Sequence, residues 1–129
     1  MWETLWRFET ANLVVTGAVA PEDSAPEDSF CEQDHIDAVH NGSLDWFCAR
    51  VQVSTKAGTL LGDDYLGACA YENARDFFNE HIREAAYARE QRAKGYLCGS
   101  YFPDMIREAI KQARHFAGKE AHTLARLHA

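Results

Sequence analysis

Alternating apolar and polar residues predict strands in the first half of the chain. In residues 45–55 every second side chain suits a buried position, which is typical of a strand with one inward face. The expected inward set is Phe47, Ala49, Val51, Val53 and Thr55. A tight turn is expected at 56–58, and a return strand at 59–71 that is interrupted near 62–64. Residues 5–20 predict a first strand that is bent or split in two, because the alternation slips at Ala11 and Asn12.

Apolar residues spaced three and four apart predict a long C-terminal helix. It should begin near Phe102 or Pro103 and run to Leu127, since proline is tolerated in a first turn. The expected buried stripe is Phe102, Ile106, Ala109, Ile110, Ala113 and Ala117. Two shorter helices are expected before it. One covers 30–41 and is opened by a capping box of Ser29 and Glu32; the other is capped by Asn73.

These elements predict one α+β domain spanning residues 1–129. We expect an antiparallel sheet of three or four strands, with a short helix, a middle helix and a long C-terminal helix packed on one face. Residues 21–29 are rich in turn formers and carboxylates, which indicates a solvated loop within this domain. The polar run at 83–94 predicts an exposed helix or a projecting insertion.

The composition narrows the class of protein. At 129 residues with 47% hydrophobic residues, the chain can bury a core, and a disordered protein is excluded. No apolar run approaches the roughly 20 residues of a membrane helix, and the opening residues lack the pattern of a secretory signal. We therefore expect a cytoplasmic protein whose cysteines are free thiols. They are Cys31, Cys48, Cys69 and Cys98.

Charge is divided unevenly along the chain. The net charge is −7, but residues 1–72 carry 13 acidic and 3 basic side chains, whereas residues 73–129 carry 7 acidic and 10 basic ones. Two surfaces of opposite potential favour a protein partner or head-to-tail self-association, so a homodimer is one of the expected arrangements. A direct nucleic-acid binder is not expected, because it would need a dominant basic surface.

Two stretches carry a resemblance to a known group of proteins. GDDYLGACAY, and then GYLCGSYFPDMIREAIKQAR, resemble small uncharacterised proteins of bacteriophages, plasmids and other mobile elements, over roughly residues 46–116. The resemblance implies a mobile-element context, in which small acidic proteins often inhibit host defence, as anti-CRISPR and anti-restriction proteins do. It implies no catalytic residue.

A metal site is one candidate chemistry. Cys31 and His35 lie four apart on an expected helix, with Asp34 and His40 nearby, so two ligands could share a face. A structural site needs four good ligands, and no further pair stands at a recognised spacing. We expect no metal and no other cofactor.

Catalytic groups are a second candidate. Asp63 and Asp64 could serve as paired carboxylates, but beside Gly62 they are better interpreted as a turn. A nucleophile and base could come from Cys98, Ser100, His81 and His115, yet no nucleophile-elbow or cysteine signature surrounds them. We expect no catalytic residue.

Seven carboxylates crowd residues 22–37. They are Glu22, Asp23, Glu27, Asp28, Glu32, Asp34 and Asp37. They could simply make the surface soluble, or they could imitate phosphates and dock on a basic groove, and both interpretations stay open. The leading hypothesis is a non-enzymatic mobile-element protein that inhibits a host defence complex through this surface. A small enzyme or nucleotide-binding protein that removes or sequesters a defence signal, and a structural accessory protein, are the alternatives.

Overall fold

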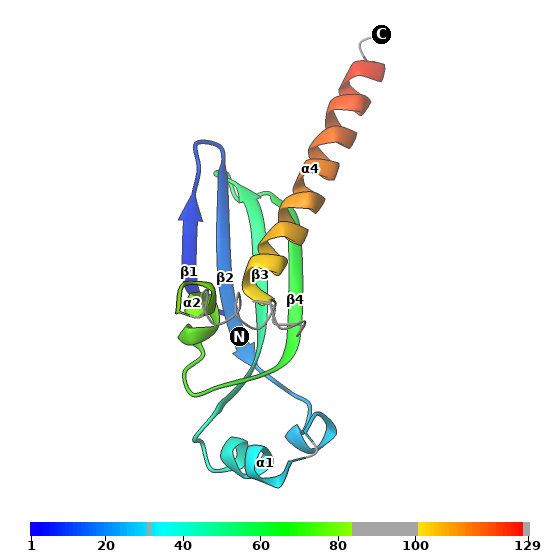
Figure 1. Cartoon of the computed structure of the whole chain (residues 1–129). Helices are drawn as coiled ribbons and strands as arrows, with labels where there is room; N and C mark the ends of the chain where they lie inside the picture. Colours follow the sequence, from blue (N-terminus) through cyan, green and yellow to red (C-terminus); the bar gives the residue numbers. More distant parts are fainter. Residues whose placement is uncertain (31, 84–100, 128–129) are drawn as a thin grey trace, which may run out of the picture.

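The computed structural model describes residues 1–30, 32–83 and 101–127, and for 80–83 and 118–127 it defines the course of the helix only. Four strands and a set of helices follow one another along the chain (Figure 1). In order they are β1 (Glu3–Glu9), β2 (Leu13–Pro21), the 3₁₀ turn η1 (Pro26–Asp28), α1 (Gln33–His40), β3 (Asp45–Thr55), β4 (Leu60–Tyr71), α2 (Arg75–Arg83) and α4 (Tyr101–Leu127).

The strands form one antiparallel sheet in the order β1-β2-β3-β4, so each strand pairs with its neighbour in the chain. The predicted strand at 5–20 is therefore two strands. The backbone N–H of Thr10 donates to Leu13 O at 2.9 Å and closes the β1–β2 hairpin around Ala11 and Asn12, where the alternation slips. The α+β class and the antiparallel sheet predicted from the sequence are confirmed, and of the three or four strands expected the structure has four.

Strand β3 confirms the predicted alternation. Phe47, Ala49, Val51 and Val53 are buried, whereas the side chains between them are half-buried or exposed. The predicted turn at 56–58 is also confirmed, because the backbone N–H of Thr55 donates to Thr59 O at 2.9 Å. Gly58 allows this turn with a φ of 96°, a conformation that suits glycine.

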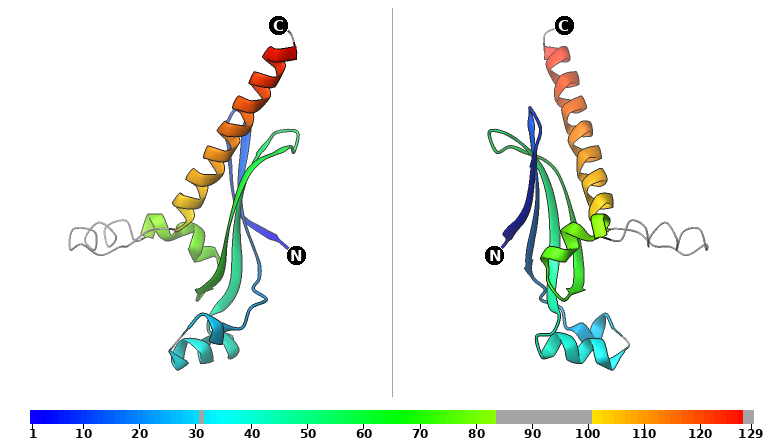
Figure 2. Two further views of the ribbon diagram at one scale, coloured as in Figure 1. Left: turned by 90° about the vertical axis from the view of Figure 1, so that its right-hand side faces the viewer. Right: turned by 60° about the vertical axis from the view of Figure 1, so that its left-hand side comes forward.

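Helices α2 and α4 lie on the same face of the sheet, and the other face carries no described helix (Figure 2). Between the helices and the sheet lies a cluster of aromatic rings. Phe78 meets Phe77 and Phe102 edge-on, with ring centroids 5.2 and 4.9 Å apart, and Trp6 of β1 meets Phe102 at 4.9 Å. Edge-to-face contacts are favourable beyond the area that they bury, so these rings join both helices to β1.

The buried face of α4 differs in part from the predicted stripe. Its buried residues are Phe102, Met105, Ala109 and Ala113. Ile106 and Ile110 pack against the core but are only half-buried, and Ala117 is exposed. The helix therefore lies with its small residues over β4, and its isoleucines lie at the edge of the contact.

One prediction within β4 is wrong. The turn expected at Gly62, Asp63 and Asp64 is absent, because β4 runs unbroken through them. A side chain at Gly62 would place its Cβ 2.2 Å from the Ala109 carbonyl oxygen, so glycine is there to let α4 approach, not to turn the chain.

Of the two predicted helix caps, one is wrong and one is confirmed. No capping box opens α1, which begins at Gln33 with no side-chain hydrogen bond at its N-cap. Asn73 does support α2, since its Oδ1 accepts a hydrogen bond from the Arg75 N–H at 3.0 Å. The polar run at 83–94 lies almost wholly outside the described residues.

Candidate functional site

The seven predicted carboxylates lie together in a lobe at one end of the sheet. This acidic lobe, residues 22–44, connects β2 to β3 and contains η1 and α1 (Figure 1). Six of the seven side chains are exposed, and Glu22 is half-buried. No lysine or arginine occurs between residues 8 and 49, so the lobe has no lysine or arginine to offset this charge.

Residues 21–29 are mostly exposed, as the predicted solvated loop requires, but they are anchored to a folded lobe. Pro26 and Ile36 are buried, and the Phe30 ring lies 5.6 Å from that of Trp46. The Trp46 indole N–H donates to the Ser24 carbonyl oxygen at 2.8 Å, which ties the lobe to the start of β3. A small apolar cluster therefore anchors the backbone that carries the carboxylates.

Two carboxylates of the lobe contact histidines. Glu27 bonds to His40 Nε2, and this hydrogen bond is the main reason that the pKa of Glu27 is lowered. Glu32 lies 3.3 Å from His35 Nδ1, one helical turn away.

The other carboxylates divide into paired and unpaired groups. Glu22 accepts from the Ser24 hydroxyl at 2.7 Å, and Asp37 accepts from Gln33 Nε2 at 2.9 Å. The carboxylates of Asp23, Asp28 and Asp34 make no hydrogen bond or ion pair within the part of the chain that the structure describes. These three are free to meet a partner.

The thiols and the metal-ligand candidates are described only in part. Cys48 and Cys69 are free thiols, as predicted, and burial raises the pKa of Cys48, with the nearby Glu22 charge adding to the shift. Cys31 and Cys98 lie outside the described residues. Within the described residues, no group of three histidine, cysteine or carboxylate side chains could hold a metal.

The predicted nucleophile–base set cannot be assembled from the described side chains. Cys98 and Ser100 lie outside the described residues, and the side chain of His81 is not described either. His115 is exposed on α4, and Asp63 and Asp64 lie within a strand. The Asp63 backbone N–H donates to Gln112 Oε1 at 3.1 Å, which is a structural contact between β4 and α4.

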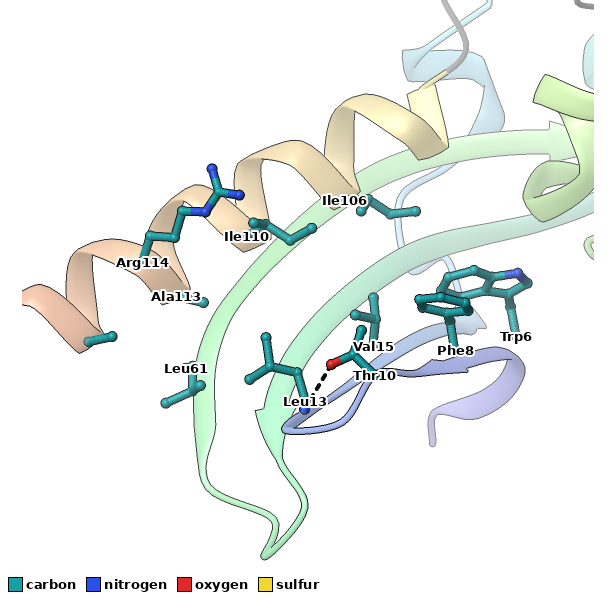
Figure 3. A pocket seen from close by; sticks show the side chains of 11 residues that line it. Trp6, Phe8, Thr10, Leu13, Val15, Leu61, Ile106, Ile110, Ala113 and Arg114 are labelled. Carbon is teal, nitrogen blue, oxygen red and sulfur yellow. Dashed lines mark hydrogen bonds between the residues drawn. The ribbon is translucent and has the colours of Figure 1, made fainter.

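An apolar groove, which sequence reasoning missed, lies near the opposite end of β2 (Figure 3). Its volume is about 590 Å³, and its lining comes from β1, β2, β4 and α4. The lining residues are Trp6, Phe8, Thr10, Leu13, Val15, Leu61, Ile106, Ile110, Ala113, Arg114 and Ala117. The alternation in 5–20 places Trp6, Phe8 and Leu13 on one face of the sheet. It does not indicate whether a helix covers that face.

The open face of the sheet carries a third feature. The Arg50 guanidinium lies over the Trp2 ring, 4.4 Å from its centroid, and Tyr65 meets Trp2 edge-on at 6.0 Å. The Arg50 Nε is buried and has no hydrogen-bond partner among the described residues. A cation held over an aromatic ring is favourable, so this contact fixes the N-terminal residues onto the sheet.

The comparisons with known proteins add no evidence on function to the geometry described above. Within the described residues, no helix combines the length and the apolar character needed to cross a bilayer. The chain matches no protein-family model, no curated protein and no solved structure.

Proposed function

We propose that this chain is a non-enzymatic, mobile-element protein that binds and inhibits a bacterial defence complex through its acidic lobe. The observation that carries the proposal is the folded lobe itself, with seven carboxylates from 22–37 and no lysine or arginine between residues 8 and 49. The mobile-element context rests on the sequence resemblance alone.

The lobe has the electrostatics of a docking surface. Clustered charges of one sign raise association rates with an oppositely charged partner, and they select that partner against others. Proteins that bind nucleic acid present basic grooves to phosphates, and a defence complex that recognises foreign nucleic acid has such a groove. A surface of fixed carboxylates would compete with the phosphates for it.

The packing of the lobe strengthens this argument. A disordered acidic loop would lose conformational entropy on binding, which reduces affinity. Here Pro26 and Ile36 are buried and the Trp46–Ser24 hydrogen bond holds the connection to β3, so the backbone that carries the carboxylates is folded before a partner arrives. Of the seven, Asp23, Asp28 and Asp34 need break no described contact to bind.

The test compares two variants with the same change in net charge. In the lobe variant, Asp23, Asp28 and Asp34 are each replaced by lysine; in the control variant, Glu3, Glu72 and Glu108 are replaced by lysine at exposed positions outside the lobe. Both are tested for protection of a phage or plasmid in hosts that carry different defence systems. We expect wild-type and control chains to protect in one such host and the lobe variant to lose protection.

Pull-down of the defence complex from that host supplies the binding measurement. Capture by the wild-type chain should weaken between 0.1 and 1 M salt, because the Debye length falls from about 10 to about 3 Å. Equal protection by the lobe variant and the wild type would refute the role of the lobe. Protection without any captured complex would favour the enzyme or nucleotide-binding alternative, and protection in no host would refute the inhibitor proposal.

A further inference from the structure

The apolar groove exists because two helices share the sheet unequally. Helix α4 lies over β3 and β4, where Gly62 lets its backbone approach closely. Helix α2 covers the part of β2 around Gly17, where a Cβ would lie 2.5 Å from the Phe78 ring. The hairpin end of β1 and β2 lies beyond α2 and to the side of α4. Its inward face therefore stays open, and Phe8 is 55% exposed.

The wall of this groove is mostly apolar. Ile106 and Ile110 come from α4, and the facing wall is built by the aromatic and aliphatic side chains of the strands (Figure 3). Of the two polar lining residues, Thr10 already accepts a hydrogen bond from the Leu13 N–H at 3.1 Å through its hydroxyl oxygen. The body of any occupant must therefore be apolar.

One charge lies at the edge of this apolar surface. Arg114 is the sole charged residue among the described side chains that line the groove, and its side chain runs along α4 beside Ile110 (Figure 3). It is exposed and makes no hydrogen bond or ion pair within the described residues. The described lining contains no carboxylate, so an occupant with a negative end would gain a cation there and meet no repulsion from these residues.

We propose that this groove binds a single-chain amphiphile with an anionic carboxylate head. The apolar chain would lie between the β1–β2 hairpin and α4, and the carboxylate would pair with the Arg114 guanidinium. A volume of about 590 Å³ lies within the range of small-molecule sites, roughly 300–1,000 Å³, which are mostly apolar with a few polar groups that fix orientation. The proposal does not depend on the acidic lobe, which lies at the other end of β2.

Calorimetric titration with dodecanoate, kept below the concentration at which it forms micelles, tests the proposal directly. We expect saturable binding of one molecule per chain. Dodecyltrimethylammonium, which has the same chain and a cationic head, should bind at least tenfold more weakly. Equal binding of the two would show that only the hydrophobic chain is recognised, and no binding of dodecanoate would refute the site.

Three variants place the ligand in the groove. Arg114→Glu should weaken dodecanoate binding at least tenfold, whereas Lys111→Glu makes the same charge change one turn away, outside the lining, and should leave affinity within about twofold. Ala117→Trp adds bulk at an exposed lining position, so it should block binding without disturbing the core. Circular dichroism and urea unfolding confirm that each variant is folded.

The contrary outcomes are equally clear. Equal losses for Arg114→Glu and Lys111→Glu would show nonspecific attraction to the helix, and unchanged binding by Ala117→Trp would place the ligand elsewhere. Light scattering on the ligand-free chain supplies the last check. A dimer that Ala117→Trp converts to a monomer would mean that a second copy of the chain fills the groove, and the amphiphile proposal would be wrong.

Discussion

Replacing Gly62 by alanine tests the contact that positions the long helix. A Cβ at this position would lie 2.2 Å from the Ala109 carbonyl oxygen and 3.0 Å from the Ala113 backbone nitrogen. Both atoms belong to the backbone of α4, so no side-chain rotation can relieve the clash. The helix would have to withdraw by about 1 Å to restore an ordinary contact, and a gap of that size forfeits a quarter to a half of the dispersion energy of the facing atoms.

The cost follows from what that withdrawal loosens. Ala109 and Phe102 are fully buried in the contact, and the hydrogen bond from the Asp63 N–H to Gln112 Oε1 would lengthen. Overpacking typically costs 1–3 kcal/mol, and a backbone clash belongs at the upper end. Alanine recovers about 0.4–1 kcal/mol by restricting the unfolded chain. We expect a net loss of about 2 kcal/mol, or roughly 6–10 °C in Tm for a chain of this size.

Gly67→Ala is the matched control in the same strand. Its Cβ would meet only the Glu22 carboxylate, at 3.6 Å, which is an ordinary contact, so the free energy of unfolding should change by less than about 0.5 kcal/mol. Urea unfolding of both variants, followed by circular dichroism, measures the difference. If Gly62→Ala proves as stable as Gly67→Ala, α4 does not pack on β4 as described.

Three further predictions concern the acidic lobe and its surroundings. Trp46→Phe removes the hydrogen bond to the Ser24 carbonyl and should lower the free energy of unfolding by about 1 kcal/mol in urea titrations; no change would mean that this bond does not hold the lobe. His40→Ala should raise the pKa of Glu27 in a carboxyl ¹³C NMR titration, because the lowered pKa comes mainly from the His40 hydrogen bond. In the wild type this pair stabilises the fold at pH values above the usual carboxyl pKa, and the stabilisation is lost as the pH falls through the lowered pKa of Glu27. If the pKa of Glu27 is the same in His40→Ala as in the wild type, the contact is not formed. Burial raises the pKa of Cys48, so iodoacetamide should modify it more slowly at pH 7 in the native chain than in urea, and equal rates would show an exposed thiol.

The sheet could be predicted because its signals are local. The alternation in 45–55 and the glycine turn after it lie within a few residues of each other, and both are confirmed. A single buried face imposes that pattern on the sequence directly. The long helix was predictable for the same reason, since its apolar spacing and first-turn proline lie within one segment.

The missed features all depend on contacts between distant segments. Gly62 beside two aspartates has the composition of a turn, and only the position of Ala109 shows that it serves close packing. The groove likewise depends on where α2 and α4 leave the sheet uncovered, which neither helix encodes alone. The carboxylates of the acidic lobe were identifiable by composition, but their ordering was not, because it rests on the Phe30 and Trp46 contact across the lobe.

The position of the acidic lobe within the chain has a consequence for how freely it can vary. It occupies the connection between β2 and β3, and every strand pairs with its neighbour in sequence, so no other pairing passes through it. Closing a connection that spans residues 22–44 instead of a two-residue turn costs about 2 kcal/mol of chain entropy, since this cost grows only with the logarithm of length. Insertions or deletions in the lobe therefore change the entropy cost of pairing β2 with β3 only slightly. The surface at this end can change its shape and charge while the sheet and its helices stay the same.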